Sequence, residues 1–115
     1  MDSIELNRLL VESLPELRQQ HLDEVSWQDG DSTGSHVVYG DVFTPTLLEC
    51  LSTPHGPELA RMLSFVESVL EKEDEYAENV IAVSVLESVA FRFNQDPSLA
   101  QHLGSKSKRL LNELG

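Results

Sequence analysis

The chain has 115 residues and a formal net charge of −12, because 20 acidic residues oppose 8 lysines and arginines. This length suits one domain, and a hydrophobic content of 40% is too high for a disordered chain. The negative charge argues against direct binding to nucleic acid or to anionic membranes, since both present phosphates. We therefore expect a single helical domain over residues 1–115 that attracts an electropositive partner.

The first 25 residues predict two short helices, or one helix bent at a proline. Asp2 with Glu5 three residues later is typical of a helix N-terminus. Pro15 suits the first turn of a second helix, because its missing N–H would be unpaired there in any case. The apolar positions of the first helix recur at helical spacing: Leu6, Leu9, Leu10 and Leu14.

A polar segment and a short β-prone segment follow. Residues 26–35 are rich in turn formers and predict a loop. Residues 36–39, His-Val-Val-Tyr, favour a strand, and Gly40 ends the run. This segment is predicted to be either extended chain over the core or one arm of a small hairpin with residues 24–27.

The middle of the chain predicts helices separated by proline-containing breaks. Thr44 and Pro45 form an expected N-cap and first-turn pair in a helix that begins near Asp41. Residues 52–57 contain a clear break, and the next helix opens at Pro57 or Glu58. Its apolar stripe is expected to face the core: Leu59, Met62, Leu63, Val66, Val69 and Leu70.

The last third predicts a long central helix and two shorter helices. Asp74 is the expected N-cap of an apolar helix over residues 75–93. Residues 94–97 precede a short helix that ends near Leu103, with Gly104 as its C′ residue. Ser105 starts a last helix with Leu110, Leu111 and Leu114 turned inward. The fold class is therefore mainly α, a compact bundle or short superhelical stack of about six helices, with room for one small β-hairpin.

Motifs for metal binding and catalysis are absent from the sequence. The four histidines, His21, His36, His55 and His102, have no metal-ligand spacing, and no nucleotide-binding or nucleophile-elbow motif occurs. Cys50 is the only cysteine, so we interpret it as a small buried residue in a reducing compartment. No signal peptide or membrane span is evident. We expect a cytoplasmic protein without cofactor, metal or enzymatic activity.

The distribution of acidic residues predicts two candidate interfaces. No lysine or arginine occurs between Arg18 and Arg61, and the block from Glu71 to Glu78 has five acids against Lys72. Aromatic residues beside acids suit the binding of arginine and lysine. The alternative is a solvated acidic face with the aromatics in the core. The candidate partner-binding residues are Trp27, Asp29, Asp31, Tyr39, Asp41, Glu73, Asp74, Glu75 and Tyr76.

Short phrases along the chain are distinctive: Ser13-Leu14-Pro15-Glu16-Leu17, His36-Val37-Val38-Tyr39-Gly40-Asp41, Asp74-Glu75-Tyr76 with Asn79-Val80 and Leu86-Glu87, and Leu103-Gly104-Ser105-Lys106-Ser107. Together they resemble an uncharacterised family of small helical bacterial domains, some of which are associated with toxin–immunity loci. The resemblance implies an antitoxin-like binding role and brings no catalytic residues.

Three functions follow as hypotheses. The first is an acidic immunity protein that neutralises a basic toxin, with a nuclease as the expected toxin, by occluding its active site. The second is a structural or regulatory adaptor that binds a protein through an apolar helical face, so that its acidity serves only solubility. The third, an enzyme with clustered carboxylates, requires carboxyl groups of strongly raised pKa in a cleft.

Overall fold

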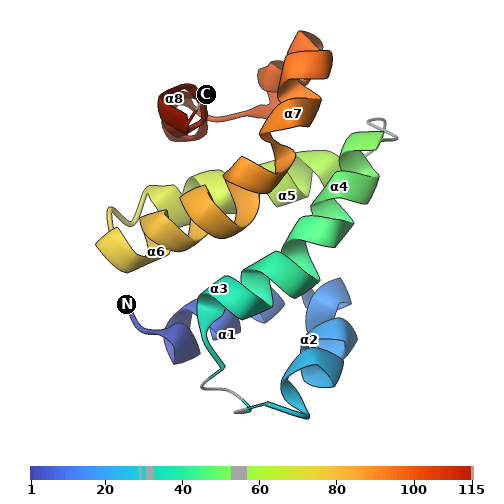
Figure 1. Cartoon of the computed structure of the whole chain (residues 1–115), viewed down its shortest axis with the longest axis vertical. Coiled ribbons are helices and arrows are strands. Elements are labelled where there is room, and N and C mark those ends of the chain that lie inside the picture. Colours follow the sequence, from blue (N-terminus) through green and yellow to red (C-terminus); the bar gives the residue numbers. More distant parts are fainter. Residues whose placement is uncertain (29, 31–32, 53–56, 115) are drawn as a thin grey trace.

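Helices make up the regular structure of the computed structural model, which describes residues 1–28, 30, 33–52 and 57–114 (Figure 1). Within these residues no strand occurs, so the mainly α prediction is confirmed. The radius of gyration is 13.3 Å, and about 13 Å is expected for a compact domain of this length. The helices therefore form a compact bundle. Of the described helices, none has the length and apolarity needed to cross a membrane.

The N-terminal pair of helices is folded as its sequence predicts. In α1 (Ser3–Ser13) the Asp2 carboxylate accepts the Glu5 N–H at 2.9 Å. Pro15 then opens a 3₁₀ turn, η1 (Pro15–Leu17), which leads into α2 (Arg18–Val25). The proline separates the two helices because it supplies no N–H to continue α1. Their inward leucines are buried: Leu6, Leu10, Leu14 and Leu17.

Residues 35–52 form one continuous helical rod, so the predicted strand and hairpin are wrong. The rod consists of α3 (Ser35–Val38), a π-helical stretch η3 (Tyr39–Phe43) and α4 (Thr44–Ser52). Val37 is 39% exposed, but four apolar residues at helical spacing are buried: Val38, Tyr39, Val42 and Phe43. Burial of this stripe outweighs the weak β-propensity of a four-residue run.

The predicted N-cap role of Thr44 is also wrong. The Thr44 N–H donates to the carbonyl of Tyr39, five residues earlier, so the residue lies inside the rod. In a regular α-helix the ring of Pro45 would collide with the carbonyl four residues before it. The wider π-helical turn stands immediately ahead of that proline and changes this spacing.

A second rod follows α5 (Pro57–Leu70), whose predicted apolar stripe is buried throughout. It consists of α6 (Glu75–Val80), the π-helical η4 (Ile81–Leu86) and α7 (Glu87–Gln95). Asp74 caps α6 as expected, since its carboxylate accepts the Ala77 N–H at 2.9 Å. The rod is less completely enclosed than its sequence suggests, because Val83 and Phe91 are about half exposed.

Two elements complete the chain, η5 (Pro97–His102) and α8 (Ser105–Leu114). Gly104 is not a left-handed C′ residue, because its φ is not positive, and Leu103, which follows η5, is extended. A Cβ at Gly104 would instead collide with the side chain of Glu67 on α5. In α8, Leu110 is buried as predicted and Leu111 is half-buried, whereas Leu114, the last residue of the helix, is 37% exposed.

Glu67 anchors α8 to α5. Its carboxylate accepts hydrogen bonds from the Ser107 N–H at 2.9 Å, the Ser107 hydroxyl at 2.8 Å and the Lys106 N–H at 3.2 Å. Burial alone would raise the pKa of Glu67, but these hydrogen bonds outweigh it and lower the pKa below its ordinary value. A carboxylate from a neighbouring helix thus satisfies the first N–H groups of α8.

The two rods cross where each is π-helical. Thr44 donates its hydroxyl proton to the Ser84 carbonyl at 2.7 Å, and His36 Nδ1 lies 2.8 Å from Ser84 Oγ. The rods are close at Gly40, where an added Cβ would make ordinary van der Waals contact, 3.9 Å from both Ser84 Cβ and the Ser84 carbonyl oxygen. Next to the crossing, Tyr39, Phe43 and Phe65 pack with ring centroids 5.7–6.3 Å apart.

Two substitutions at Gly40 are expected to change the stability of the protein in opposite directions. Gly40→Ala should stabilise the protein by up to about 1 kcal/mol, because alanine favours helix and its Cβ meets only ordinary contacts. Gly40→Leu should destabilise it by about 1–3 kcal/mol, because its larger side chain overpacks the crossing. Urea unfolding of both variants measures the difference. Equal stability of the two variants would contradict close packing at this point.

Replacement of Glu67 is expected to weaken the attachment of α8 in a pH-dependent way. Glu67→Gln should cost about 1 kcal/mol near neutral pH, because a neutral amide replaces a carboxylate that is only partly shielded from solvent. The stabilisation by Glu67 is complete above its ordinary pKa of 4.5 and is lost as the pH falls through its lowered pKa in the folded protein. Thermal unfolding against pH tests this, and a Tm difference that persists unchanged at acid pH would refute it.

Candidate protein-binding surface

An acidic groove lies beside the N-terminal half of α6. It encloses about 880 Å³ and is lined by Glu73, Glu75, Tyr76, Glu78, Asn79 and Ala82. Residues 75, 78, 79 and 82 fall on one face of the helix at its i, i+3, i+4 and i+7 spacing. The three glutamates are exposed, and the carboxylates of Glu75 and Glu78 have no hydrogen bond or ion pair within the described part of the chain. This arrangement presents negative charge to solvent.

Glu73 is set at the rim of the groove by an unusual backbone conformation. Its φ is +54°, a left-handed value that costs energy for any residue with a Cβ. Its N–H donates to the Leu70 carbonyl at 3.1 Å, which closes the C-terminal end of α5. Its carboxylate lies 3.3 Å from the Lys106 ammonium group. The turn thus points Glu73 toward solvent, and Lys106 neutralises only part of the negative charge at this rim.

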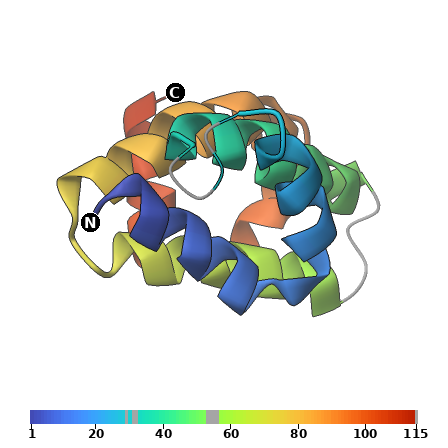
Figure 2. The same ribbon diagram turned by 90° about the horizontal axis from the view of Figure 1, so that it is seen from below.

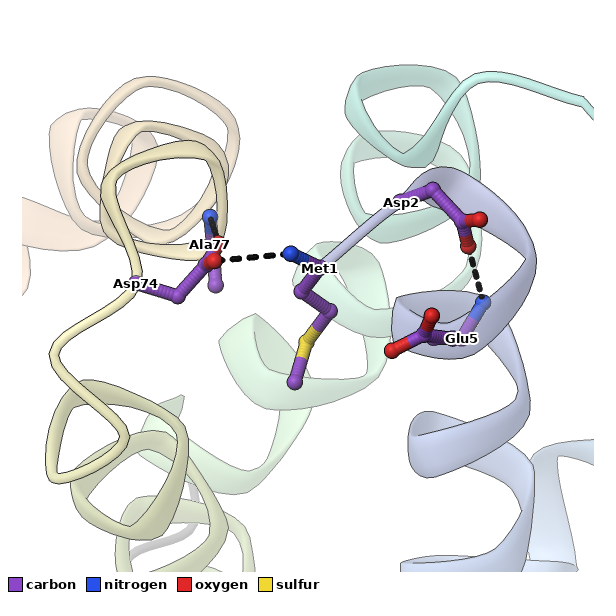
Figure 3. A network of polar contacts seen from close by, with 5 residues as sticks. All are labelled: Met1, Asp2, Glu5, Asp74 and Ala77. Carbon is purple, nitrogen blue, oxygen red and sulfur yellow. Dashed lines mark hydrogen bonds and ion pairs between the residues drawn. The ribbon is translucent and has the colours of Figure 1, made fainter.

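Asp74 has a structural role at the start of α6 (Figure 3). One carboxylate oxygen accepts the Ala77 N–H, and the other lies 2.8 Å from the α-amino group of Met1. The hydrogen bond from the Met1 amine and that from Ala77 lower the pKa of Asp74. The same contact raises the pKa of the amine. Since both oxygens have internal partners, Asp74 contributes less to the groove than its neighbours do.

Tyr76 is partly a core residue and partly a surface residue, so both interpretations of the aromatic candidates apply to it. Its hydroxyl lies 2.7 Å from Ser3 Oγ and accepts the Ser35 N–H at 3.3 Å, so it ties α6 to α1 and α3. Its ring stands edge-on to His36, with centroids 6.0 Å apart. The side chain is half-buried and still lines the groove. The ring therefore borders the groove, while the hydroxyl holds α6 against α1 and α3.

His36 and Ser84 form a pair that is better suited to packing than to catalysis. A serine hydroxyl beside a histidine is one component of a nucleophilic site. Within the described residues, however, no carboxylate orients His36, and its Nε2 lies 3.4 Å from the Asn79 amide nitrogen. The pair links the two rods at their crossing.

The remaining aromatic and acidic candidates do not gather at the groove. Trp27 is 73% exposed just beyond α2, and α2 lies on the opposite side of the molecule from the start of α6 in both views (Figures 1 and 2). Asp41 is exposed on the rod of residues 35–52. Asp29 and Asp31 lie outside the described residues.

Tyr39 is not a surface contact, contrary to its place among the candidates. It is completely buried, and its hydroxyl donates to the Leu6 carbonyl at 2.7 Å. Burial raises the pKa of this hydroxyl well above its ordinary value. The helix that starts at Ser35 turns Tyr39 toward Phe43 and Phe65, whereas a strand would have left its direction open. It belongs to the core.

Glu78, Asn79 and Ala82 complete the groove but are missing from the sequence-based candidates. Their signal was the helical spacing from Glu75, which places them on the same face. The block of acids was interpreted as a linear cluster, although in a helix alternate residues point in different directions. Asn79 carries no charge and Ala82 is apolar, so composition alone does not single them out.

Neither Cys50 nor the metal-binding residue types form a nucleophilic or metal site within the described residues. Burial raises the pKa of the half-buried Cys50 thiol, and the nearby Glu58, Glu49 and Glu16 raise it further, so the thiol is a weak nucleophile at neutral pH. Among the residues described, no group of three or more metal-binding side chains comes together. The arrangement that remains is a charged, open surface.

A family model described as "Domain of unknown function (DUF7674)" matches residues 7–114. The chain belongs to this family. The expected membership in an uncharacterised family is therefore confirmed, and the match spans both the groove and the crossing of the two rods. Comparisons with curated proteins and with solved structures each give no significant match.

Replacements of Asp74 should separate its two contacts. Asp74→Ala removes both the cap and the ion pair, whereas Asp74→Asn retains a good capping residue and loses only the charge. Tm should therefore fall more for Asp74→Ala than for Asp74→Asn, and Asp41→Asn, which removes an exposed charge elsewhere, should leave it unchanged.

The effect of the ion pair should also depend on pH. The contribution of Asp74 is complete above its ordinary pKa of 3.8 and is lost as the pH falls through its lowered pKa in the folded protein. The contribution of the amine is complete below 8.0 and is lost as the pH rises through its raised pKa. Thermal melts of wild type and Asp74→Asn across this range measure it, and a constant Tm difference at all pH values would exclude the ion pair.

Proposed function

We propose that this protein is a non-enzymatic binding protein whose acidic groove beside α6 receives a basic protein. In its more specific version, the proposal is that the protein is an immunity protein. It would neutralise a basic toxin, with a nuclease as the expected toxin, by covering the toxin's active site. The observation that carries the proposal is the set of three exposed glutamates, Glu73, Glu75 and Glu78, around one open groove. Only Glu73 among them has an ion-pair partner in the described residues.

Charge supports this choice of partner. A net charge of −12 attracts cationic surfaces and accelerates association with them, at a rate that falls with ionic strength. A nuclease presents such a surface, because it must bind phosphate groups. Tyr76 offers an aromatic ring beside Glu75 and Glu78, a combination that suits an arginine side chain. The resemblance to bacterial domains of toxin–immunity loci and a cytoplasmic location belong to the same proposal.

An adaptor that docks through an apolar helical face is the second candidate function. Trp27 and Leu22 favour it, because they are 73% and 51% exposed on α2 and the turn that follows it. Large exposed apolar side chains that form one patch often mark protein interfaces. For such an adaptor, binding depends on apolar contact and changes little with salt.

The test compares wild type with Glu75→Gln/Glu78→Gln. Wild type is used to capture its partner at low salt from an extract of the source organism, and the purified partner is then titrated by surface plasmon resonance. Neutralising two groove carboxylates should weaken binding about three- to tenfold. The association rate should fall steeply as salt rises. Glu12→Gln/Glu87→Gln is the matched control, because it removes two exposed charges outside the groove.

The outcomes separate the two functions. A basic partner that salt releases, and whose nuclease activity the wild-type protein inhibits, supports the immunity proposal. A neutral or acidic partner that stays bound at high salt, with equal affinity for both double variants, overturns it and favours the adaptor.

A further inference from the structure

A second groove lies between α1 and α2, on a different part of the molecule from the acidic groove. It encloses about 230 Å³ and is lined by Ile4, Asn7, Arg8, Val11, Arg18, His21 and Leu22. The α1 residues stand at i, i+3, i+4 and i+7, and the α2 residues at i, i+3 and i+4. One stripe of each helix therefore faces the groove. The Pro15 turn, η1, connects the two helices that border this space.

Exposed aliphatic side chains line this groove. Leu22 is 51% exposed and Ile4 is 39% exposed, while Val11 is half-buried. Pockets for whole small-molecule ligands usually enclose about 300–1,000 Å³. A smaller apolar groove between two helices suits one large side chain from a partner, the usual anchor of a helix that binds in a groove.

Two arginines stand at the groove, and Arg8 also borders a neighbouring depression with Glu5 and Glu12. Arg8 and Arg18 are exposed, and neither has an ion pair within the described residues. Glu5 and Glu12 lie one turn from Arg8 on α1 but do not pair with it. On α2, the Asp23 carboxylate instead accepts a hydrogen bond from Gln19 at 2.9 Å. In a chain with so few cations, two available guanidinium groups beside an apolar groove favour a carboxylate.

His21 is a second, independent observation at this groove, because one of its buried ring nitrogens has no hydrogen-bond partner in the described part of the chain. It lines the same groove and is only 6% exposed, and its buried Nε2 has no hydrogen-bond partner among the described residues. A buried polar atom without a partner costs free energy. An acidic group brought into the groove would supply an acceptor close to this histidine.

We propose that the α1–α2 groove binds an acidic amphipathic helix of a protein partner. An apolar side chain of that helix packs between Ile4 and Leu22, and its flanking carboxylates pair with Arg8 and Arg18. The charge of the ligand is opposite to that expected at the α6 groove. This site shares no lining residue with the α6 groove and does not depend on the immunity proposal, although Leu22 also belongs to the apolar face considered for an adaptor.

The experiment uses a fluorescein-labelled peptide of repeated Leu-Glu-Glu-Leu units and measures anisotropy with the full chain. Arg8→Ala/Arg18→Ala should weaken binding at least about fivefold, since two ion pairs are lost. Lys108→Ala/Arg109→Ala is the matched control, because it also removes two exposed cations but lies outside the groove. Leu22→Ser should weaken binding as well, and Glu75→Gln/Glu78→Gln should not. Circular dichroism verifies the fold of each variant.

Two control peptides and one structural readout complete the test. Replacing every Glu of the peptide by Gln, or every Leu by Ser, should abolish measurable binding, and NMR signals of the His21 ring should shift on titration with the parent peptide. The proposal is overturned by absence of binding at millimolar peptide, by equal affinity of the two double cation variants, or by equal binding of the Gln peptide. Self-association of wild type that Arg8→Ala/Arg18→Ala abolishes would overturn it too, because the occupant would then be a second copy of this chain.

Discussion

The close crossing of two bent helical rods is the constraint on which the other elements depend. Gly40 and Ser84 meet there, and the Thr44 hydroxyl bonds the Ser84 carbonyl between the rods. This contact fixes the direction of Tyr39, whose hydroxyl then reaches Leu6 and holds α1 against the first rod. It also places His36 beside Tyr76, and the Tyr76 hydroxyl joins Ser3 and Ser35. Each rod is π-helical at this crossing, over Tyr39–Phe43 and Ile81–Leu86.

The acidic residues of this chain have two distinct physical roles. Asp2, Asp74 and Asp96 cap the helices that follow them. Glu67, on the neighbouring α5, likewise accepts a hydrogen bond from the N-terminus of α8. These carboxylates have internal partners and stabilise the fold. Glu75 and Glu78, by contrast, have exposed carboxylates without partners in the described residues. The net charge therefore overstates the charge available to a binding partner, because some of the carboxylates already have partners within the protein.

The two grooves carry opposite chemistry on separate helices. The α6 groove is rimmed by glutamates, whereas the α1–α2 groove has two arginines and a buried histidine beside aliphatic side chains. The two grooves share no lining residue. A protein of this size can therefore present an acidic surface to one partner and a cationic, apolar surface to another.

Local sequence signals were sufficient for most helix ends and for the buried stripe of α5. An aspartate cap, a proline in a first turn and an apolar repeat each act within a few residues, so Asp2, Pro15 and Asp74 had predictable roles. The same local approach failed for residues 36–39 and for Thr44, because a short run favours a strand only weakly and packing against Phe65 decides the outcome. Gly104 was misinterpreted for a similar reason, since the residue that excludes its Cβ lies on a distant helix.

The sequence by itself determined the helical class, the acidic character and the candidate block around α6, since these depend on composition and on short-range spacing. Only the tertiary structure decided which of those acids are free. It placed Glu75 and Glu78 in an open groove, committed Asp74 to Ala77 and Met1, and removed Tyr39 from the surface. It also brought Arg8, Arg18 and His21 to one groove, although no pattern in the sequence joins them. Burial and pairing arise from contacts between segments far apart in the chain, and spacing along the chain does not encode them.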